Sequence, residues 1–177
     1  MEDVRRELMA QAAKMERTGL PLTHVDSHQH MHMLPGVIDI SLDVAASLNL
    51  DAVRISRTPL FTAFAGMGQL IGRLGLFTLS ELSLWKAKRR HFRVPDHFEG
   101  IVAGEAVHEG HFLHILKDLR PGTTEVMMHP GTDNEKLIPA CDWEHDFEAE
   151  MQAIVSPKVR RMIADKAVKV VNYRDLK

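Results

Sequence analysis

The sequence is poor in cysteine and carries little net charge. Its single cysteine, Cys141, excludes an internal disulfide framework and a cysteine-based zinc motif. No context typical of a cysteine protease or a redox centre surrounds Cys141, so we predict an ordinary residue near a loop. A formal net charge of -2 does not point to nucleic acid or to an anionic membrane as a partner.

The chain also lacks a long uninterrupted apolar run. Its longest apolar region, from Leu60 to Leu84, is broken by polar residues and glycines, which makes it a poor membrane span. The N-terminal Met-Glu-Asp-Val-Arg-Arg has no apolar segment of a signal peptide, so we expect a cytoplasmic chain. With 177 residues, 45% hydrophobic and 26% charged, the chain is predicted to be a globular domain or a substantial part of one.

Histidine, in contrast, is concentrated in one stretch, Thr23–Met33. Four of the eleven histidines fall here, and His24, Asp26, His28, His30 and His32 occupy every second position. Alternate side chains of an extended chain point to one face, so a strand here would present a row of imidazoles and one carboxylate. Such a face suits a divalent metal or proton transfer; a His-rich surface strand without a ligand is the alternative.

Hydrophobic periodicity and turn residues predict an alternation of helices and strands. The segment 2–18 has apolar residues at helical spacing, and Ser156-Pro157 is a typical N-cap followed by proline. The predicted helices are 2–18, 37–48, most of 64–90, 105–119, 143–154 and 157–166; the predicted strands are 23–33 (running into a loop), 52–55, 100–102, 124–129 and 168–172, with a polar loop before Asp142. This order predicts an α/β fold, with parallel strands flanked by helices.

Functional groups in such folds gather where strands end. The His-rich stretch and His129, which precedes Pro130-Gly131, both lie at such points, so we expect them to converge. A metal with three or more protein ligands and an open position activates water for attack on a carbonyl group. A separate histidine can then protonate the leaving group.

Three segments carry a resemblance to a known family. Thr23–His32, Glu125–Gly131 and Asn172–Leu176 resemble, in the same order, the motifs of the YdjC-like carbohydrate deacetylases, which include chitooligosaccharide deacetylases. Two further segments, Gly19–Leu22 and Pro95–Gly100, together with Gln29 in the His motif, look most like the hopanoid-biosynthesis-associated branch. The resemblance implies a partial TIM-barrel-like (β/α) fold and a metal-dependent hydrolase that removes N-acetyl groups from amino sugars.

The resemblance also implies roles for individual residues. His28, the first histidine after Asp-Ser, matches a ligand of the divalent metal, magnesium or zinc. His129 and Asp26 match catalytic residues, with His129 as acid or substrate-orienting group and Asp26 orienting His28. Arg54, together with His30 and His32, is expected to contact substrate. A hydrogen-bonded structural role is the alternative for each of them.

One departure from the family pattern affects the metal site. Family members begin with a strand bearing an Asn-Ala-Asp-Asp-Phe-Gly-like segment and later carry a Gly-x-His segment; this sequence contains neither. We therefore expect residues 1–177 to be a single deacetylase domain that is N-terminally incomplete. The exposed strand edges of an incomplete barrel favour a homo-oligomer.

Three functions remain open from the sequence. The first is a carbohydrate deacetylase acting on an N-acetylated sugar or glycolipid, inactive if part of its metal site is missing. The second is a non-catalytic family member that serves as a binding or structural module. The third is a metal-binding His-rich protein without sugar specificity.

Overall fold

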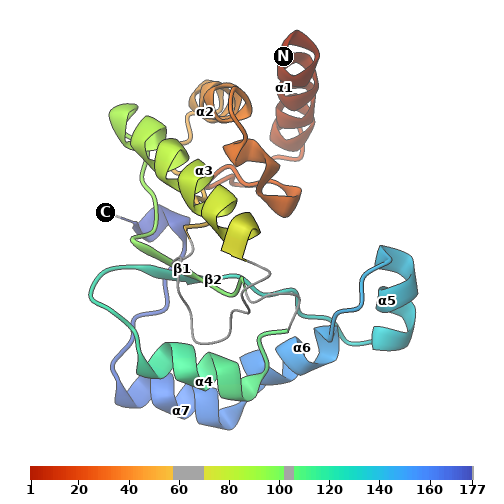
Figure 1. The fold of residues 1–177 in the computed structure, drawn as a ribbon, viewed down its shortest axis with the longest axis vertical. Coiled ribbons are helices and arrows are strands. Elements are labelled where there is room, and N and C mark those ends of the chain that lie inside the picture. The colour runs from red at the N-terminus through yellow and green to blue at the C-terminus, as the bar shows by residue number, and fades with distance from the viewer. Residues whose placement is uncertain (58–69, 102–105, 177) are drawn as a thin grey trace. The chain divides into compact units, whose positions relative to one another are not determined.

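The structure, a computed structural model, describes residues 1–57, 70–101 and 106–176. Its contacts divide the chain into two compact units. The first unit contains residues 1–57, 71–96 and 171–176, and the second contains residues 97–101 and 106–170. We describe each unit separately (Figure 1).

The first unit is built from helices and from single parallel bridges between extended segments. Its helices are α1 (Glu2–Glu16), α2 (Val37–Ser47) and α3 (Leu70–Arg89), with the 3-10 helices η1 (His28–Met33) and η3 (Tyr173–Asp175). Parallel bridges join Val25 to Val53 and Ala52 to Arg93. Each bridge therefore joins one extended segment to the next along the chain, as in an α/β fold.

Two apolar clusters hold the first unit together. The larger one gathers residues of η1, α2, α3 and the bridged segments: Met33, Ile38, Leu42, Ala45, Val53, Ile55, Ala87 and Phe92. In the smaller one, Ala12 of α1 packs with Ile40 and Val44 of α2. Helix α2 therefore has two apolar faces at helical spacing: Ile38, Leu42 and Ala45 belong to the larger cluster, and Ile40 and Val44 pack against α1.

In its described part, the second unit has a two-stranded parallel sheet and four helices. Strand β1 (His97–Glu99) pairs with β2 (Thr124–Val126). Helix α4 (Glu109–Lys117) packs against α6 (Phe147–Val155) and runs beside α7 (Pro157–Asp165), and α5 (Asn134–Cys141) contacts α6 (Figure 1). The Ser156 hydroxyl caps α7 by accepting the N–H of Lys158 at 3.1 Å, as the Ser-Pro pair predicted.

The predicted helices are confirmed where the structure describes them, although their ends shift by a few residues. The residues before Leu70 in the predicted helix 64–90 lie outside the described part. Helix α5 replaces the predicted loop before Asp142, and its N-cap Asp133 accepts the N–H of Lys136. Among the described residues, no helix is both long and apolar enough to cross a membrane.

The predicted strands are confirmed only in part. Only Val25 of 23–33 and the pair 52–53 form bridges, 124–129 shortens to β2, and 168–172 forms no strand. The third strand lies at His97–Glu99, just before the expected 100–102, of which residue 102 lies outside the described part. The α/β class with parallel strands beside helices is confirmed, whereas no barrel is seen in the described part of the chain.

Candidate functional site

The His-rich stretch is a turn, and the expectation of a strand with one imidazole face is wrong. Val25 is extended, but Gln29 and His30 adopt left-handed backbone angles, with φ of 50° and 58°, inside η1. The chain therefore reverses between His28 and His32, and the every-second-residue pattern no longer places the side chains on one face. Each imidazole has its own environment.

His32 is enclosed and hydrogen-bonded at both ring nitrogens. It is 2% exposed, with Nδ1 2.7 Å from the Ser27 hydroxyl and Nε2 2.7 Å from the carbonyl oxygen of Arg54. A carbonyl oxygen only accepts, so Nε2 carries the proton and Nδ1 accepts from Ser27. This arrangement fits the structural role that the sequence left open for His32.

The other histidines of the stretch are more exposed. His30 is half-buried, with Nδ1 2.7 Å from the hydroxyl of the buried Ser56. His28 is exposed and has no hydrogen-bonding partner within the described residues. His24 stacks on Tyr173, with ring centroids 3.6 Å apart. His28 is therefore the member of the stretch whose ring is left available to a ligand.

Asp26 and Arg54 form an ion pair beside this turn. The Val25–Val53 bridge brings their backbones together, and the N–H of Arg54 donates to the Val25 carbonyl at 3.0 Å. The carboxylate is 29% exposed and the guanidinium 20%, so both groups remain accessible. Asp26 is thus bound by Arg54, and no hydrogen bond joins it to His28 in the part of the chain that the structure describes.

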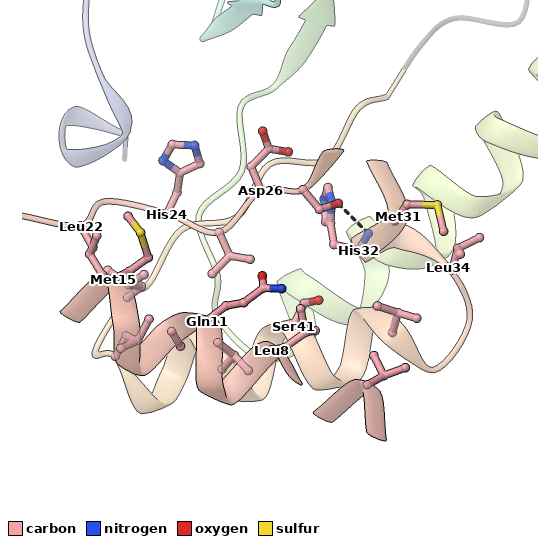
Figure 2. Close-up of a pocket in the computed structure, with 18 residues that line it drawn as sticks. Leu8, Gln11, Met15, Leu22, His24, Asp26, Met31, His32, Leu34 and Ser41 are labelled. Atoms are coloured by element: carbon pink, nitrogen blue, oxygen red, sulfur yellow. Dashed lines mark hydrogen bonds between the residues drawn. The ribbon is translucent and has the colours of Figure 1, made fainter. Parts of the chain in front are cut away.

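A cavity of about 470 Å³ lies on one side of the turn. Figure 2 shows His24 and Asp26 along one side of it and Leu8 and Gln11 of α1 along the other. Most of its remaining lining comes from apolar side chains of α1, α2 and the turn. The cavity is therefore suited to an apolar group more than to a charged one.

The second unit contains a different group of ligand-type side chains. One ligand atom from each of His129, His145 and Glu150 lies within 4.8 Å of the others. Glu150 is 1% exposed and accepts the backbone N–H groups of Val107, at 2.8 Å, and of His129. The buried carboxylate thereby fixes the backbone at the end of β2.

Aromatic rings surround this group. Trp143 stacks on His145, with centroids 4.1 Å apart and an interplanar angle of 23°, and meets the His129 ring edge-on at 5.0 Å. Phe147 lies edge-on to His145 at 4.9 Å. His145 is 4% exposed and Trp143 is 38% exposed. The histidines therefore lie in a largely apolar environment, with the indole at the surface.

Gly131 allows the loop after His129 to pack closely on α6. A Cβ at Gly131 would lie 2.9 Å from the Phe147 Cβ and closer still to Leu137, so no larger residue fits. The N–H of Gly131 also donates to the Phe147 carbonyl at 3.0 Å. The Pro-Gly pair, predicted only to end a strand, thus positions His129 relative to the start of α6.

The sequence prediction had included His129 but missed His145 and Glu150. One signal was available, because the buried positions of α6 recur every three residues at Phe147, Glu150 and Ala153. A carboxylate on the apolar stripe of a helix requires a buried partner, so this position predicts a hydrogen-bonded or metal-binding Glu150.

The structure thus brings Asp26, Arg54, His30 and His32 together in the first unit, with His28 at the surface of the same turn. It places His129 in the second unit with His145 and Glu150. The expected convergence of His129 with the His-rich stretch remains a prediction, as do the catalytic and ligand roles.

Comparison with known proteins gives a consistent result. The profile of the family described as "YdjC-like protein" matches residues 1–165. A "Carbohydrate deacetylase" of Thermoanaerobacter pseudethanolicus is 27% identical over 177 residues, covering 100% of this chain and 61% of the relative. The mouse protein of the same name is 28% identical over 201 residues, covering 99% of this chain and 63% of the relative.

A human "Carbohydrate deacetylase" is 28% identical over 202 residues, covering 99% of this chain and 60% of the relative. The chain thus spans about three fifths of the length of these relatives. No solved structure matches it.

Proposed function

Because the chain belongs to the YdjC-like protein family, we propose that it serves the removal of N-acetyl groups from amino sugars. The observation that carries the proposal is the match over residues 1–165, together with relatives named carbohydrate deacetylases. The hopanoid-branch features of the sequence add a glycolipid as a candidate substrate beside simple N-acetyl sugars. The named relatives, covered to about three fifths of their length, support the reaction class.

We propose a divalent metal, magnesium or zinc, as cofactor. Imidazole and carboxylate groups are common ligands of these ions. In this proposal the exposed imidazole of His28 supplies one of the ligands that the metal requires. The bound metal would polarise the acetyl carbonyl group and lower the pKa of a water molecule. The segments that bear the family's other ligands, Asn-Ala-Asp-Asp-Phe-Gly-like and Gly-x-His, do not occur in this sequence.

The chain's own groups have defined tasks in this hydrolysis. The reaction joins a water oxygen to the acetyl carbon, breaks the carbon–nitrogen bond and needs a proton on the departing amine. We propose a ring nitrogen of His129 as the proton donor. Asp26, held by Arg54, orients the turn that carries His28, and Arg54 hydrogen-bonds the sugar.

His30 and His32 support this turn from inside. Their bonds to Ser56 and to the Arg54 carbonyl hold the backbone on both sides of the left-handed residues. In this proposal they contribute to substrate binding by positioning the turn, in keeping with the enclosure of His32.

A non-catalytic binding module is the second candidate, because of one observation. Among the described residues, no three-membered group of ligand-type side chains includes His28; the group found there lies at His129, His145 and Glu150. A chain that binds a sugar without hydrolysing it is consistent with a first unit that offers a single metal ligand.

Acetate release separates the two candidates. We expect the chain, supplied with magnesium or zinc, to release acetate from N-acetylated chitooligosaccharides, and His28→Ala to abolish that release. His114→Ala, which removes an exposed histidine of α4, is the matched control and should retain the activity. Sugar binding without acetate release would establish the binding module, and an unchanged rate in His28→Ala would overturn the assignment of His28.

A further inference from the structure

We infer that His129, His145 and Glu150 form a zinc site in the second unit, separate from any metal held by His28. This inference goes beyond the proposed function and does not depend on it. It rests on the ring nitrogens of His145, on the distances between ligand atoms and on the chemistry of the three donors.

His145 has an unusual environment for an imidazole. It is 4% exposed, and neither Nδ1 nor Nε2 has a hydrogen-bonding partner among residues 1–57, 70–101 and 106–176. Buried polar atoms in folded proteins are nearly always paired, because leaving one unpaired costs the free energy of desolvation. The ring is held in place by Trp143 and Phe147, and its Nε2 lies beside the Glu150 carboxylate. A ligand between these groups would give the nitrogen its partner.

The distances match those in a zinc site. Zinc binds nitrogen and oxygen ligands at about 2.0–2.1 Å in a tetrahedron, so two ligand atoms are about 3.3–3.4 Å apart. His145 Nε2 lies 3.3 Å from Glu150 Oε1, and ligand atoms of all three side chains lie within 4.8 Å of one another. The upper limit of 4.8 Å exceeds the tetrahedral spacing, so zinc binding would draw the half-buried His129 ring closer to the other two side chains.

The donor set favours zinc over magnesium and calcium. Two imidazoles and one carboxylate suit zinc, whereas magnesium and calcium prefer oxygen ligands throughout. The Glu150 carboxylate uses two acceptor positions for backbone N–H groups, and about four are available on an ionised carboxylate. In the described part of the chain no lysine or arginine pairs with Glu150, so zinc would also supply the missing positive charge.

Three protein ligands leave a fourth position for water or for a small anion. His129 is the most exposed of the three ligands, so this position lies on its side of the group. Zinc here would occupy a ring nitrogen of His129. The other ring nitrogen would keep its proton, so the zinc site and the proposed proton donation concern different atoms of His129 and can be tested separately.

Binding of zinc alone to the full chain tests the inference. Equilibrium dialysis gives the stoichiometry, and Co²⁺, a spectroscopic substitute, gives a visible absorption band whose intensity reports tetrahedral coordination. We expect His145→Ala to weaken zinc binding at this site by at least the 10–100-fold that loss of outer-shell partners costs and to remove the tetrahedral band. The matched control His114→Ala should retain both.

His129→Ala is the second variant, because it removes a half-buried ring and keeps the contacts of His145 with Trp143 and Phe147. Circular dichroism of each variant verifies the fold, and His129→Ala decides the question if His145→Ala does not fold. The inference would be overturned if the wild-type chain gave no tetrahedral Co²⁺ band. It would also be overturned if His129→Ala bound zinc as tightly as the wild type. Neither readout involves acetate, so failure of the proposed deacetylation leaves this test intact.

Discussion

The two histidine groups of the molecule differ in how their ring nitrogens are used. In the first unit, four histidines lie within nine residues of sequence, yet His30 and His32 bond to groups of the protein. In the second unit, His129 and His145 are sixteen residues apart, yet they share one buried carboxylate and one of them has no hydrogen-bonding partner in the described residues. Histidines that are close in sequence can thus have their ring nitrogens occupied by local hydrogen bonds. A set of metal ligands arises instead where separate elements meet.

The cause is the geometry of the two backbones. A tight turn brings each His-rich side chain close to neighbouring hydroxyl and carbonyl groups, such as Ser27 and the carbonyl of Arg54, which satisfy it. In the second unit, β2, the Pro-Gly loop and α6 approach from different directions, and Glu150 receives one N–H from each of two loops. The first group stabilises its own turn, and the second joins distant parts of a unit.

The largest expected effect concerns Glu150. Glu150→Ala removes the acceptor for the N–H groups of Val107 and His129, and two unsatisfied buried donors cost about 2–6 kcal/mol in unfolding free energy. Urea denaturation in the presence of a chelator measures this cost without metal. Glu144→Ala, at an exposed position nearby, is the control and should stay within about 0.5 kcal/mol of wild type. Equal stability of the two variants would show that the Glu150 carboxylate does not stabilise the second unit.

A smaller difference in unfolding free energy is expected between His32→Ala and His28→Ala. His32→Ala leaves the Arg54 carbonyl without its donor and the Ser27 O–H without its acceptor, and it opens a cavity, which costs about 2–4 kcal/mol. His28→Ala, at an exposed site, should cost no more than about 0.5 kcal/mol. Urea denaturation of the pair measures the difference. Similar losses in both would mean that the turn does not depend on the enclosed imidazole.

The helices could be predicted from the sequence because they depend on local patterns. Apolar stripes and the Ser156-Pro157 pair are visible in a single chain, and α1 and α7 follow them. Helix α5 was missed because Pro139 lies inside it and it buries no residue, so its sequence resembles a polar loop. Strands of three residues, such as β1 and β2, are too short to show an alternation.

The candidate sites were less predictable because they depend on tertiary structure. The left-handed backbone of Gln29 and His30 carries no glycine signal, so the sequence indicated a strand. The Asp26–Arg54 pair depends on a bridge between segments 28 residues apart, and the partners of His129 depend on the packing of α6. The family motifs indicated His129 as a candidate site residue. His145 and Glu150 are identified beside it only by the packing of α6 in the structure.

The smallest expected effect is a pH dependence of opposite sign in the two units. Hydrogen bonds from Arg5 and then Arg90 lower the pKa of Asp43 below 3.8, against a smaller effect of burial. Burial raises the pKa of Glu99 above 4.5, and Arg120, with His97 and His114, offsets only part of this. Asp43 therefore stabilises the fold above its unfolded pKa, and this stability is lost as pH falls through its folded pKa. Glu99 lowers stability as pH rises from its unfolded pKa through its folded pKa.

Urea denaturation of Asp43→Asn and Glu99→Gln at neutral and at acidic pH measures both effects. Asp43→Asn should be less stable than wild type at neutral pH, and added salt should reduce the difference because the carboxylate is 37% exposed. Glu99→Gln should be more stable than wild type at neutral pH, and that gain should disappear once Glu99 is protonated. A loss of stability in both variants at neutral pH would show that the second unit, like the first, depends on an ionised carboxylate at this position.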